Sequence, residues 1–248
     1  MDMWALADYS ALAERLAPAA QALVDAVAPL AGHRVLDVGA GTGNVAVLAA
    51  AAGAQVTACD SSPRMIELGR RRTGDGVRWL KADVEEPPLP DGAVDAVLSS
   101  FGLIFAAHPE VAVAQARRVL VPGGVLAFTS WPVGGFMAEM TRTMRPFLPP
   151  HPDAPDAMSW GDQDVVRARL AAEFDAVHLQ VLTLPWRFES GAAMTDFFLA
   201  HSPAHVAAAH AAGDRAGEMF AAVEALAAPN GGPVDLDAEY LLVRATAR

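Results

Sequence analysis

The sequence has few of the residues that brace small secreted proteins or bind nucleic acid. Cysteine occurs once, as Cys59, so no disulfide can form within the chain and nothing points to an oxidising compartment. Basic residues number 18 against 29 acidic ones, which gives the 248-residue chain a net charge of −11. Such a charge repels a phosphate backbone. The longest basic run, residues 70–72, is typical of the solvated end of a helix, so we do not expect nucleic acid as a partner.

Long hydrophobic runs are also missing. The longest apolar stretch, residues 45–52, is far shorter than the roughly 20 residues that cross a bilayer. The first residues include Asp2, Asp8 and Glu14 and lack the basic start and apolar centre of a signal peptide. We therefore expect a cytoplasmic protein without a membrane partner. Hydrophobic residues make up 53% of the chain and charged ones 19%, which indicates a globular core that needs no disulfide or metal.

Short apolar strands alternate with helices through residues 34–131. The predicted strands are 34–38, 55–60, 77–81, 94–99 and 125–130. The predicted helices between them are 44–52, 62–72 and 109–120. Strands separated by helices in this way form βαβ units, which predicts an α/β fold with a parallel sheet and helices on both faces. Residues 10–27 precede this pattern and are expected to form two short helices, or one helix kinked at Pro18.

After Trp131 the pattern changes to segments rich in proline, methionine and aromatic residues. We expect a helix at 162–173, a strand at 177–188, a helical block at 190–228 and a last strand at 237–246. Because strands of the sheet interrupt these segments, they do not form a second domain. We expect one domain, 1–248, with N-terminal helices at 1–30, a ligand-binding core at 34–131 and lid insertions at 132–175 and 189–230.

Residues 35–43 contain the motif that carries the chemistry. Gly39, Gly41 and Gly43 follow a predicted strand and precede a helix, so the backbone of this turn can approach a ligand closely. Dinucleotide sites use the spacing G-x-G-x-x-G instead. Asp37 stands two residues before the first glycine, where it would repel a pyrophosphate but attract a ligand that carries an amino group and a sulfonium. The motif therefore favours S-adenosylmethionine over NAD.

The motif resembles the D-x-G-x-G-x-G signature of class I S-adenosylmethionine-dependent methyltransferases, in their bacterial small-molecule branch. Asp60 comes 21 residues after Gly39, where the family's acid takes the ribose hydroxyls. Asp83 and Val84 follow the third strand, where the family's Asp caps the adenine amino group, and residues 118–124 are similar to the family's R-x-L-x-P-G-G. The resemblance covers residues 35–131. It implies a Rossmann-like, mostly parallel sheet of seven strands in the order 3-2-1-4-5-7-6, with strand seven antiparallel.

The resemblance also implies which residues bind the cofactor, S-adenosylmethionine. Tyr9 matches a position where many relatives place an aromatic ring over it. The implied cofactor-binding residues are Tyr9, Asp37, Gly39, Ala40, Gly41, Thr42, Gly43, Asp60, Ser61, Met65, Asp83, Val84, Ser99 and Phe101. Residues 99–102 lack the two prolines that nucleic-acid amino-methylating relatives carry after strand four, which argues against that branch of the family.

Methionines and aromatic residues are concentrated outside the regular sheet. Many of them belong to the core, but their number also indicates an adaptable apolar cavity for a flat or lipophilic molecule. They are Phe136, Met137, Met140, Met144, Phe147, Met158, Trp160, Trp186, Phe188, Met194, Phe197 and Phe198. We predict a substrate pocket formed by Phe105, Trp131, Phe136 and Met137.

Histidines are the remaining candidates for catalysis or metal binding. His201 and His205 have the spacing of a metal pair, but Ser202 and Pro203 start a helix between them and no third ligand is near, so no metal site is expected. His108 precedes a helix close to the predicted substrate site. It is either a catalytic base or a helix cap. Cys59, inside a strand, is expected to be inert.

The predicted function is transfer of a methyl group from S-adenosylmethionine to oxygen, carbon or nitrogen of a small apolar or aromatic metabolite. Two alternatives stay open. One is an S-adenosylmethionine-binding enzyme of the same fold that catalyses a different reaction, and the other is a catalytically silent accessory protein. The sequence does not choose between a monomer and a homodimer, or name the substrate.

Overall fold

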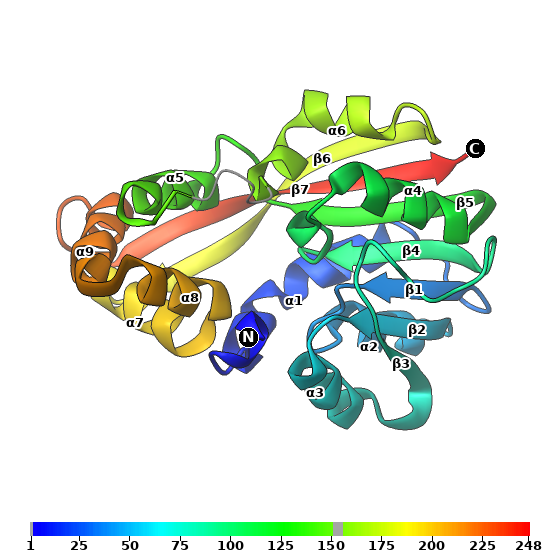
Figure 1. Ribbon diagram of the computed structural model, residues 1–248, viewed down its shortest axis with the longest axis horizontal. Coiled ribbons are helices and arrows are strands. Elements are labelled where there is room, and N and C mark those ends of the chain that lie inside the picture. Colours follow the sequence, from blue (N-terminus) through cyan, green and yellow to red (C-terminus); the bar gives the residue numbers. More distant parts are fainter. Residues whose placement is uncertain (1, 151–155) are drawn as a thin grey trace.

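A seven-stranded sheet organises the described residues, 2–150 and 156–248, of the computed structural model (Figure 1). The strands are β1 (Arg34–Val38), β2 (Gln55–Asp60), β3 (Val77–Lys81), β4 (Val94–Ser100), β5 (Leu120–Ser130), β6 (Phe174–Phe188) and β7 (Val234–Ala247). Their order is β3-β2-β1-β4-β5-β7-β6. Only β7 runs antiparallel to its neighbours, β5 and β6, within this sheet. The predicted fold class, strand order and direction of the last strand are confirmed.

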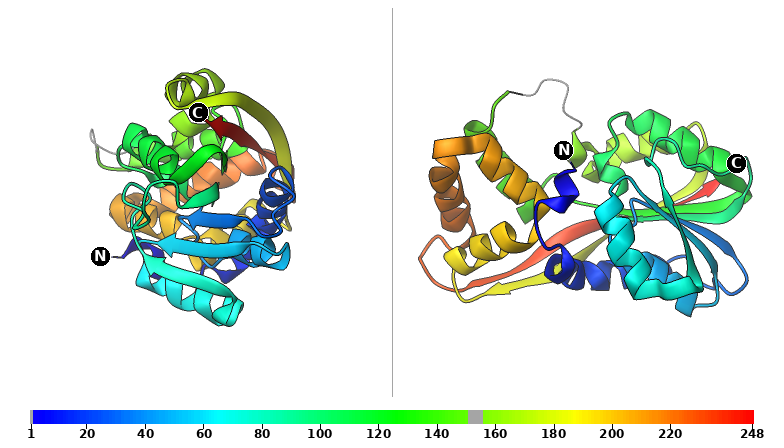
Figure 2. Two further views of the ribbon diagram at one scale, coloured as in Figure 1. Left: turned by 90° about the vertical axis from the view of Figure 1, so that its right-hand side faces the viewer. Right: turned by 60° about the horizontal axis from the view of Figure 1, so that its bottom comes forward.

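Helices cover both faces of the sheet (Figure 2). The α-helices of the described residues are α1 (Ser10–Asp25), α2 (Asn44–Ala51), α3 (Pro63–Thr73), α4 (Pro109–Val119), α5 (Phe136–Met144), α6 (Gln163–Leu170), α7 (Gly191–His201), α8 (Pro203–Ala212) and α9 (Ala216–Ala227). Pro18 lies inside α1, so the N-terminal region forms one helix. None of these helices is long and apolar enough to cross a membrane.

Two hydrophobic clusters lie on opposite faces of the sheet. Val35 of β1 packs with the apolar residues of α1, α2 and α3, whereas the next residue, Leu36, packs with those of α4. The same division separates Ala96 from Val97 in β4. Side chains that alternate between two covered faces explain why the central strands are apolar throughout.

β6 and β7 are longer than the other strands and extend beyond the rest of the sheet (Figure 1). Their extended ends carry α5, α7, α8 and α9, which form one helical layer out of the predicted lid segments 132–175 and 189–230. α6 belongs to the first of these segments but packs on β6 beside α4 instead. Residues 151–155, including His151, are part of the same segment and lie outside the described residues.

The ring of Trp79, in β3, packs tightly between the sheet and α3. A Cβ on Gly69, in the middle of α3, would lie 2.2 Å from two carbons of the Trp79 ring. The ring is also held by its Nε1, which donates a hydrogen bond to Thr73 Oγ1 at 2.9 Å. Because an added methyl group overpacks this contact, only glycine fits at position 69 without a shift of the ring.

We expect Gly69→Ala to lower the free energy of unfolding by about 1–3 kcal/mol, the usual effect of overpacking. Gly217→Ala is the matched control, because Gly217 lies in α9 with no atom near its added Cβ. The control should raise stability by about 0.4–1 kcal/mol, since alanine restricts the unfolded chain. Denaturant titration measures both. Equal effects of the two substitutions would contradict the packing argument.

Candidate functional site

Three glycines shape the turn that follows β1. Gly39, Gly41 and Gly43 have positive φ angles of +60°, +56° and +85°, which residues with a side chain rarely adopt. A Cβ on Gly39 would lie 2.8 Å from the Cα of Gly102, in the loop after β4. The two loops therefore touch backbone to backbone. They meet where the strand order reverses between β1 and β4, the place where ligands bind in open parallel sheets.

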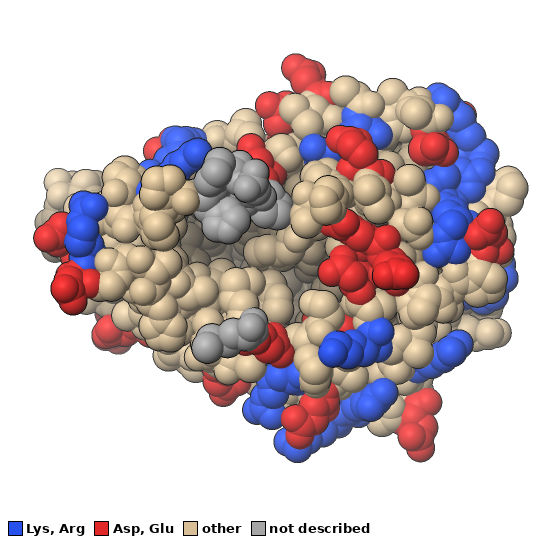
Figure 3. Space-filling model, viewed as in Figure 1, with Lys and Arg blue, Asp and Glu red and all other residues tan. Residues whose placement is uncertain are grey.

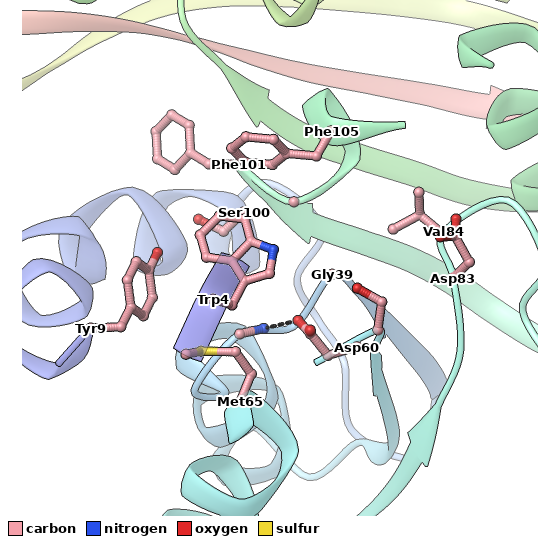
Figure 4. A pocket seen from close by; sticks show the side chains of 13 residues that line it. Trp4, Tyr9, Gly39, Asp60, Met65, Asp83, Val84, Ser100, Phe101 and Phe105 are labelled. Carbon is pink, nitrogen blue, oxygen red and sulfur yellow. Dashed lines mark hydrogen bonds between the residues drawn. The ribbon is translucent and has the colours of Figure 1, made fainter. Parts of the chain in front are cut away.

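Asp60 ends β2 and ties this turn to the start of α3. Its Oδ2 accepts a hydrogen bond from the Gly41 N–H at 2.8 Å (Figure 4), and its Oδ1 accepts one from the Ser62 N–H at 2.9 Å. Burial raises the pKa of Asp60, although both bonds favour the carboxylate. An ionised carboxylate has about four acceptor positions, so Asp60 keeps capacity for the hydroxyl groups of a ligand.

A cavity of about 90 Å³ lies in front of the glycine turn. Its walls come from that turn, the ends of β2 and β3, the loop after β4 and the N-terminal segment (Figure 4). They are formed by Trp4, Tyr9, Gly39, Gly41, Asp60, Ser61, Met65, Asp83, Val84, Ser100, Phe101, Gly102 and Phe105. Most of the residues that the resemblance implied for cofactor binding are thus brought together.

Asp37 lies beside this cavity, in a recess of about 30 Å³ that Ala40 and Thr42 also line. It is 1% exposed, and its Oδ2 has no hydrogen-bond partner among the described residues. Burial raises the pKa of Asp37 well above its ordinary value. A buried acceptor without a partner is costly, so a cationic donor that reaches Asp37 is bound favourably. The amino group of S-adenosylmethionine is such a donor, so the chemistry of Asp37 suits the cofactor that the sequence resemblance implies.

Two of the implied cofactor residues line neither the cavity nor the recess. The Oγ of Ser99 donates to the Val38 carbonyl and accepts from the Leu103 N–H, both at 2.8 Å, and so joins β1 to the loop after β4. Ser100 lines the cavity instead, because successive side chains of a strand point to opposite faces. Gly43 is the N-cap residue of α2, where its positive φ ends the turn.

No sequence pattern predicted a role for Trp4. It lies in a 3-10 helix, Met3–Ala5, and its ring, which lines the cavity, meets Phe105 edge-on with centroids 5.0 Å apart (Figure 4). Asp2 holds this segment in place. One of its carboxylate oxygens accepts from the Trp4 N–H at 3.0 Å, and the other accepts from Ser62 Oγ at 2.7 Å. Trp4 is therefore positioned by contacts between distant parts of the chain.

Phe101 has a φ of +55°, a rare conformation for a residue with a side chain. Its N–H donates to Thr129 Oγ1 at 3.1 Å, and its ring stacks on Trp131 with centroids 4.1 Å apart. Backbone strain of this kind persists only where surrounding contacts maintain it, and it is common at functional sites. Here it places the Phe101 ring between the first cavity and a second one.

The second cavity has a volume of about 320 Å³. It shares Trp4, Tyr9, Phe101 and Phe105 with the first, so these aromatic residues form the boundary between the two. Its other lining residues are Leu12, Leu16, Ile104, Trp131, Met137, Met140, Thr141, Met144, Leu148, Ala157, Met158, Trp186, Phe198, Ser202, Ala204, His205 and Ala208. None of these described residues is Asp, Glu, Lys or Arg. Figure 3 shows a hollow on this face, bordered mainly by uncharged side chains.

The predicted substrate residues divide between the cavity and the core. Phe105, Trp131 and Met137 line the cavity, whereas Phe136 packs, partly buried, against the hydrophobic core. Trp160 and Met194 are likewise core residues. Half-buried side chains at the edge of the helical layer were thus hard to assign from composition alone.

The structure does not bring His108 to either cavity. It is the N-cap residue of α4, as its place before Pro109 indicated, but its side chain does not bond to the helix backbone. Instead the ring Nδ1 lies 2.8 Å from Glu85 Oε2, and the side chain is 72% exposed. The Glu85 carboxylate also accepts from the His108 N–H at 2.6 Å. His108 therefore links the loop after β3 to the loop after β4.

The other candidate histidines bond to groups of the protein itself. The Nδ1 of His201 lies 3.0 Å from the Asp8 carbonyl, and that of His205 lies 2.7 Å from Ser202 Oγ. In the described part of the chain no group of three metal-ligating side chains occurs. Burial raises the pKa of the Cys59 thiol to about 12, in keeping with an inert side chain.

Comparison with known proteins connects this site to a family. Residues 36–128 match a family described as "Methyltransferase domain". An uncharacterised protein of Mycobacterium tuberculosis is 40% identical over 169 residues, which are 66% of this chain and 62% of that protein. The match thus spans less than two thirds of that relative's length. A second uncharacterised protein of the same species is 33% identical over 256 residues, which cover 99% of this chain and 93% of that protein.

A demethylmenaquinone methyltransferase of Clavibacter sepedonicus is 44% identical over 113 residues, 44% of this chain and 46% of that protein. Two solved structures share the fold at 18% sequence identity. The YcgJ protein of Bacillus subtilis has a TM-score of 0.61 and aligns over 95% of this chain and 98% of its own. A geranyl diphosphate methyltransferase in complex with S-adenosylmethionine has a TM-score of 0.56, over 94% and 85%.

The strand order, the glycine turn and the buried acids beside it define a Rossmann-like protein whose cofactor is S-adenosylmethionine. The chain belongs to the family of class I S-adenosylmethionine-dependent methyltransferases.

We expect cofactor binding to release a proton from Asp37. Burial raises the pKa of Asp37 in the free protein, and a cationic amino group beside it favours the ionised carboxylate. Affinity for S-adenosylhomocysteine should therefore fall as the pH drops through the pKa of Asp37. Calorimetry in buffers of different ionisation enthalpy measures the release, which Asp37→Asn should reduce. An affinity that does not change with pH would contradict this coupling between Asp37 and the cofactor.

His108→Gln should leave turnover within a few-fold of the parent, because the exposed ring pairs with Glu85 and lines neither cavity. Loss of a catalytic base would instead lower turnover by about 10²–10⁴-fold. Glu85→Gln, which removes the other partner of the same pair, is the matched control. Steady-state rates of both variants decide the role. A loss of that size in His108→Gln alone would show that the ring reaches the substrate.

Proposed function

We propose that the protein transfers a methyl group from S-adenosylmethionine to an oxygen, carbon or nitrogen atom of a small apolar or aromatic metabolite. The observation that carries this proposal is the second cavity. It is lined by uncharged and mostly apolar residues and is separated from the cofactor cavity only by shared aromatic side chains. Its volume of about 320 Å³ falls in the usual range for small-molecule pockets.

In this proposal three acids orient the cofactor. Asp37 pairs with the amino group through its unpartnered Oδ2, and Asp60 accepts from the ribose hydroxyls. Asp83, exposed on the far side of the cavity, accepts from the adenine amino group. With Asp37 in the recess and Asp60 and Asp83 at the cavity (Figure 4), the acids match an elongated ligand with polar groups at both ends. When bound, the cofactor supplies an electrophilic methyl group on a positively charged sulfur.

The aromatic boundary aligns the reactants and excludes water. Trp4, Phe101 and Phe105 lie where the two cavities meet, so a substrate ring in the second cavity contacts the same side chains as the cofactor. Alignment and a dry environment account for most of the acceleration in a displacement that removes a positive charge. Burial, together with the nearby Asp60, raises the pKa of Tyr9 to about 12, so its hydroxyl stays protonated at neutral pH.

A relative's name supports a small-molecule substrate, since one of the matched proteins is a demethylmenaquinone methyltransferase. The absence of charged side chains from the described cavity lining argues against amino acids, polyamines and nucleotides, because a charge buried without a partner is costly. We further propose that the protein acts in the cytoplasm.

Formation of S-adenosylhomocysteine tests this function. The protein is incubated with isotope-labelled S-adenosylmethionine and a metabolite extract divided into lipophilic and charged fractions, and labelled products are identified by mass spectrometry. We expect label in compounds of the lipophilic fraction. Label only in charged compounds would contradict the proposed substrate class. Tight cofactor binding without S-adenosylhomocysteine in any fraction would instead support a different reaction or an accessory role.

Asp60→Ala should weaken S-adenosylhomocysteine binding by about 1.5–3 kcal/mol, because hydrogen bonds to a charged group are lost. Asp164→Ala is the control, since Asp164 is exposed in α6 and lines neither cavity. Calorimetry measures both affinities. An unchanged affinity of Asp60→Ala would contradict the assigned position of the ribose.

A further inference from the structure

His205 is an exception in the second cavity, where nearly all other lining residues are apolar. It is the third residue of α8 and half-buried, and it lines the cavity with Phe198 of the preceding helix. The sequence offered only a metal role for this residue, together with His201. Since no metal cluster exists among the described residues, its presence in an apolar cavity needs another reason.

Two contacts fix the orientation of the imidazole ring. Its Nδ1 lies 2.7 Å from the Oγ of Ser202, the buried N-cap residue of α8. One face of the ring stacks on Phe198, with centroids 4.2 Å apart and an interplanar angle of 9°. A ring that is held on one face and at one nitrogen has little rotational freedom, so its other nitrogen is preorganised for a ligand.

That second nitrogen, Nε2, has no hydrogen-bond partner among the described residues. Unlike the indole nitrogens of Trp160 and Trp186, which also lack a partner, Nε2 is not fully buried. Nε2 therefore keeps some accessible surface, on a residue that lines the second cavity. A purely apolar molecule in the cavity would leave Nε2 without a hydrogen bond, which lowers the free energy gained on binding. A ligand group that hydrogen-bonds to Nε2 removes this cost.

His205 is neutral under physiological conditions. Burial lowers its pKa to about 4, and the described cavity lining contains no carboxylate that would favour the charged form. In a neutral imidazole one nitrogen donates a hydrogen bond and the other accepts one. Because the Ser202 hydroxyl can either donate or accept, Nε2 can pair with a carbonyl oxygen or with a hydroxyl group of the ligand.

We propose that His205, held by Ser202 and Phe198, is the polar anchor of the substrate cavity and selects an uncharged ring compound that carries a hydroxyl or carbonyl group. This inference rests on the proposed function, because it assumes that the second cavity holds the substrate. Ser202 acts through His205 and is a positioning residue. The apolar walls of the cavity favour the hydrocarbon part of the ligand ring. The fixed Nε2 of His205 determines the orientation in which the ligand binds.

The test uses the full-length protein saturated with S-adenosylhomocysteine and two probes of similar shape, 2-naphthol and 2-methylnaphthalene. Equilibrium dialysis gives the ratio of their affinities, which isolates the contribution of the hydroxyl group. We expect His205→Phe, which keeps an aromatic ring on Phe198, to shift this ratio against 2-naphthol by about 3- to 10-fold, the worth of one hydrogen bond. 2-Naphthoate, which is charged, should not bind to the parent.

Three further variants make the result specific. His205→Gln, which can still form the hydrogen bond, should keep a ratio close to that of the parent. His210→Phe is the matched control, because His210 is exposed on the same helix. If His205→Phe does not fold, Ser202→Ala replaces it and should shift the ratio in the same direction, since the ring is then free to rotate.

An unchanged affinity ratio in His205→Phe would overturn the proposal, as would an unchanged ratio in Ser202→Ala where that variant is used instead. Tight binding of 2-naphthoate would also overturn it. Failure of the proposed function is distinguishable, because this assay needs no turnover. If the protein transfers methyl groups but the affinity ratio is unchanged, only the proposed role of His205 is contradicted. A shifted ratio without methyl transfer in any extract would retain the anchor and remove the proposed reaction.

Discussion

The backbone contact between Gly39 and Gly102 is the constraint on which the site depends. These residues follow β1 and β4, and neither tolerates a Cβ, because the two backbones are too close. Their contact occurs where helices leave the two strands toward opposite faces of the sheet, and so opens the crevice in which a ligand can lie. The position of Asp60 follows from the same arrangement, since it holds Gly41 by a direct hydrogen bond.

The two cavities that meet at this crevice differ in electrostatics. On one side lie the buried acids Asp37 and Asp60, whose pKa values are raised by burial. On the other side the described lining carries no formal charge. In the proposed function, the cost of burying charge would direct a cationic cofactor to the first cavity and an uncharged substrate to the second.

The cofactor half of the site was largely predictable because it is local in sequence. The glycine turn and the acids that end β2 and follow β3 lie at fixed distances from strands whose ends meet at one edge of the sheet. The predicted residues differ from the cavity lining by small shifts with a geometric cause. Ser99 was predicted to face the cofactor, but Ser100 lines the cavity, since a shift of one residue in a strand reverses the face.

The sequence alone determined three features: the alternation of strands and helices, the strand order implied by the motif, and the acidic side of the cofactor cavity. Only the tertiary structure decided which residues line the second cavity. Trp4 reaches the cavity through Asp2 and Ser62, and His205 is set beside it by the packing of α8 against α7 and α9. Such positions depend on contacts between distant segments, which no spacing in the chain encodes. His108 shows the same limit, because nearness in sequence to the loop after β4 did not bring its side chain to the cavity.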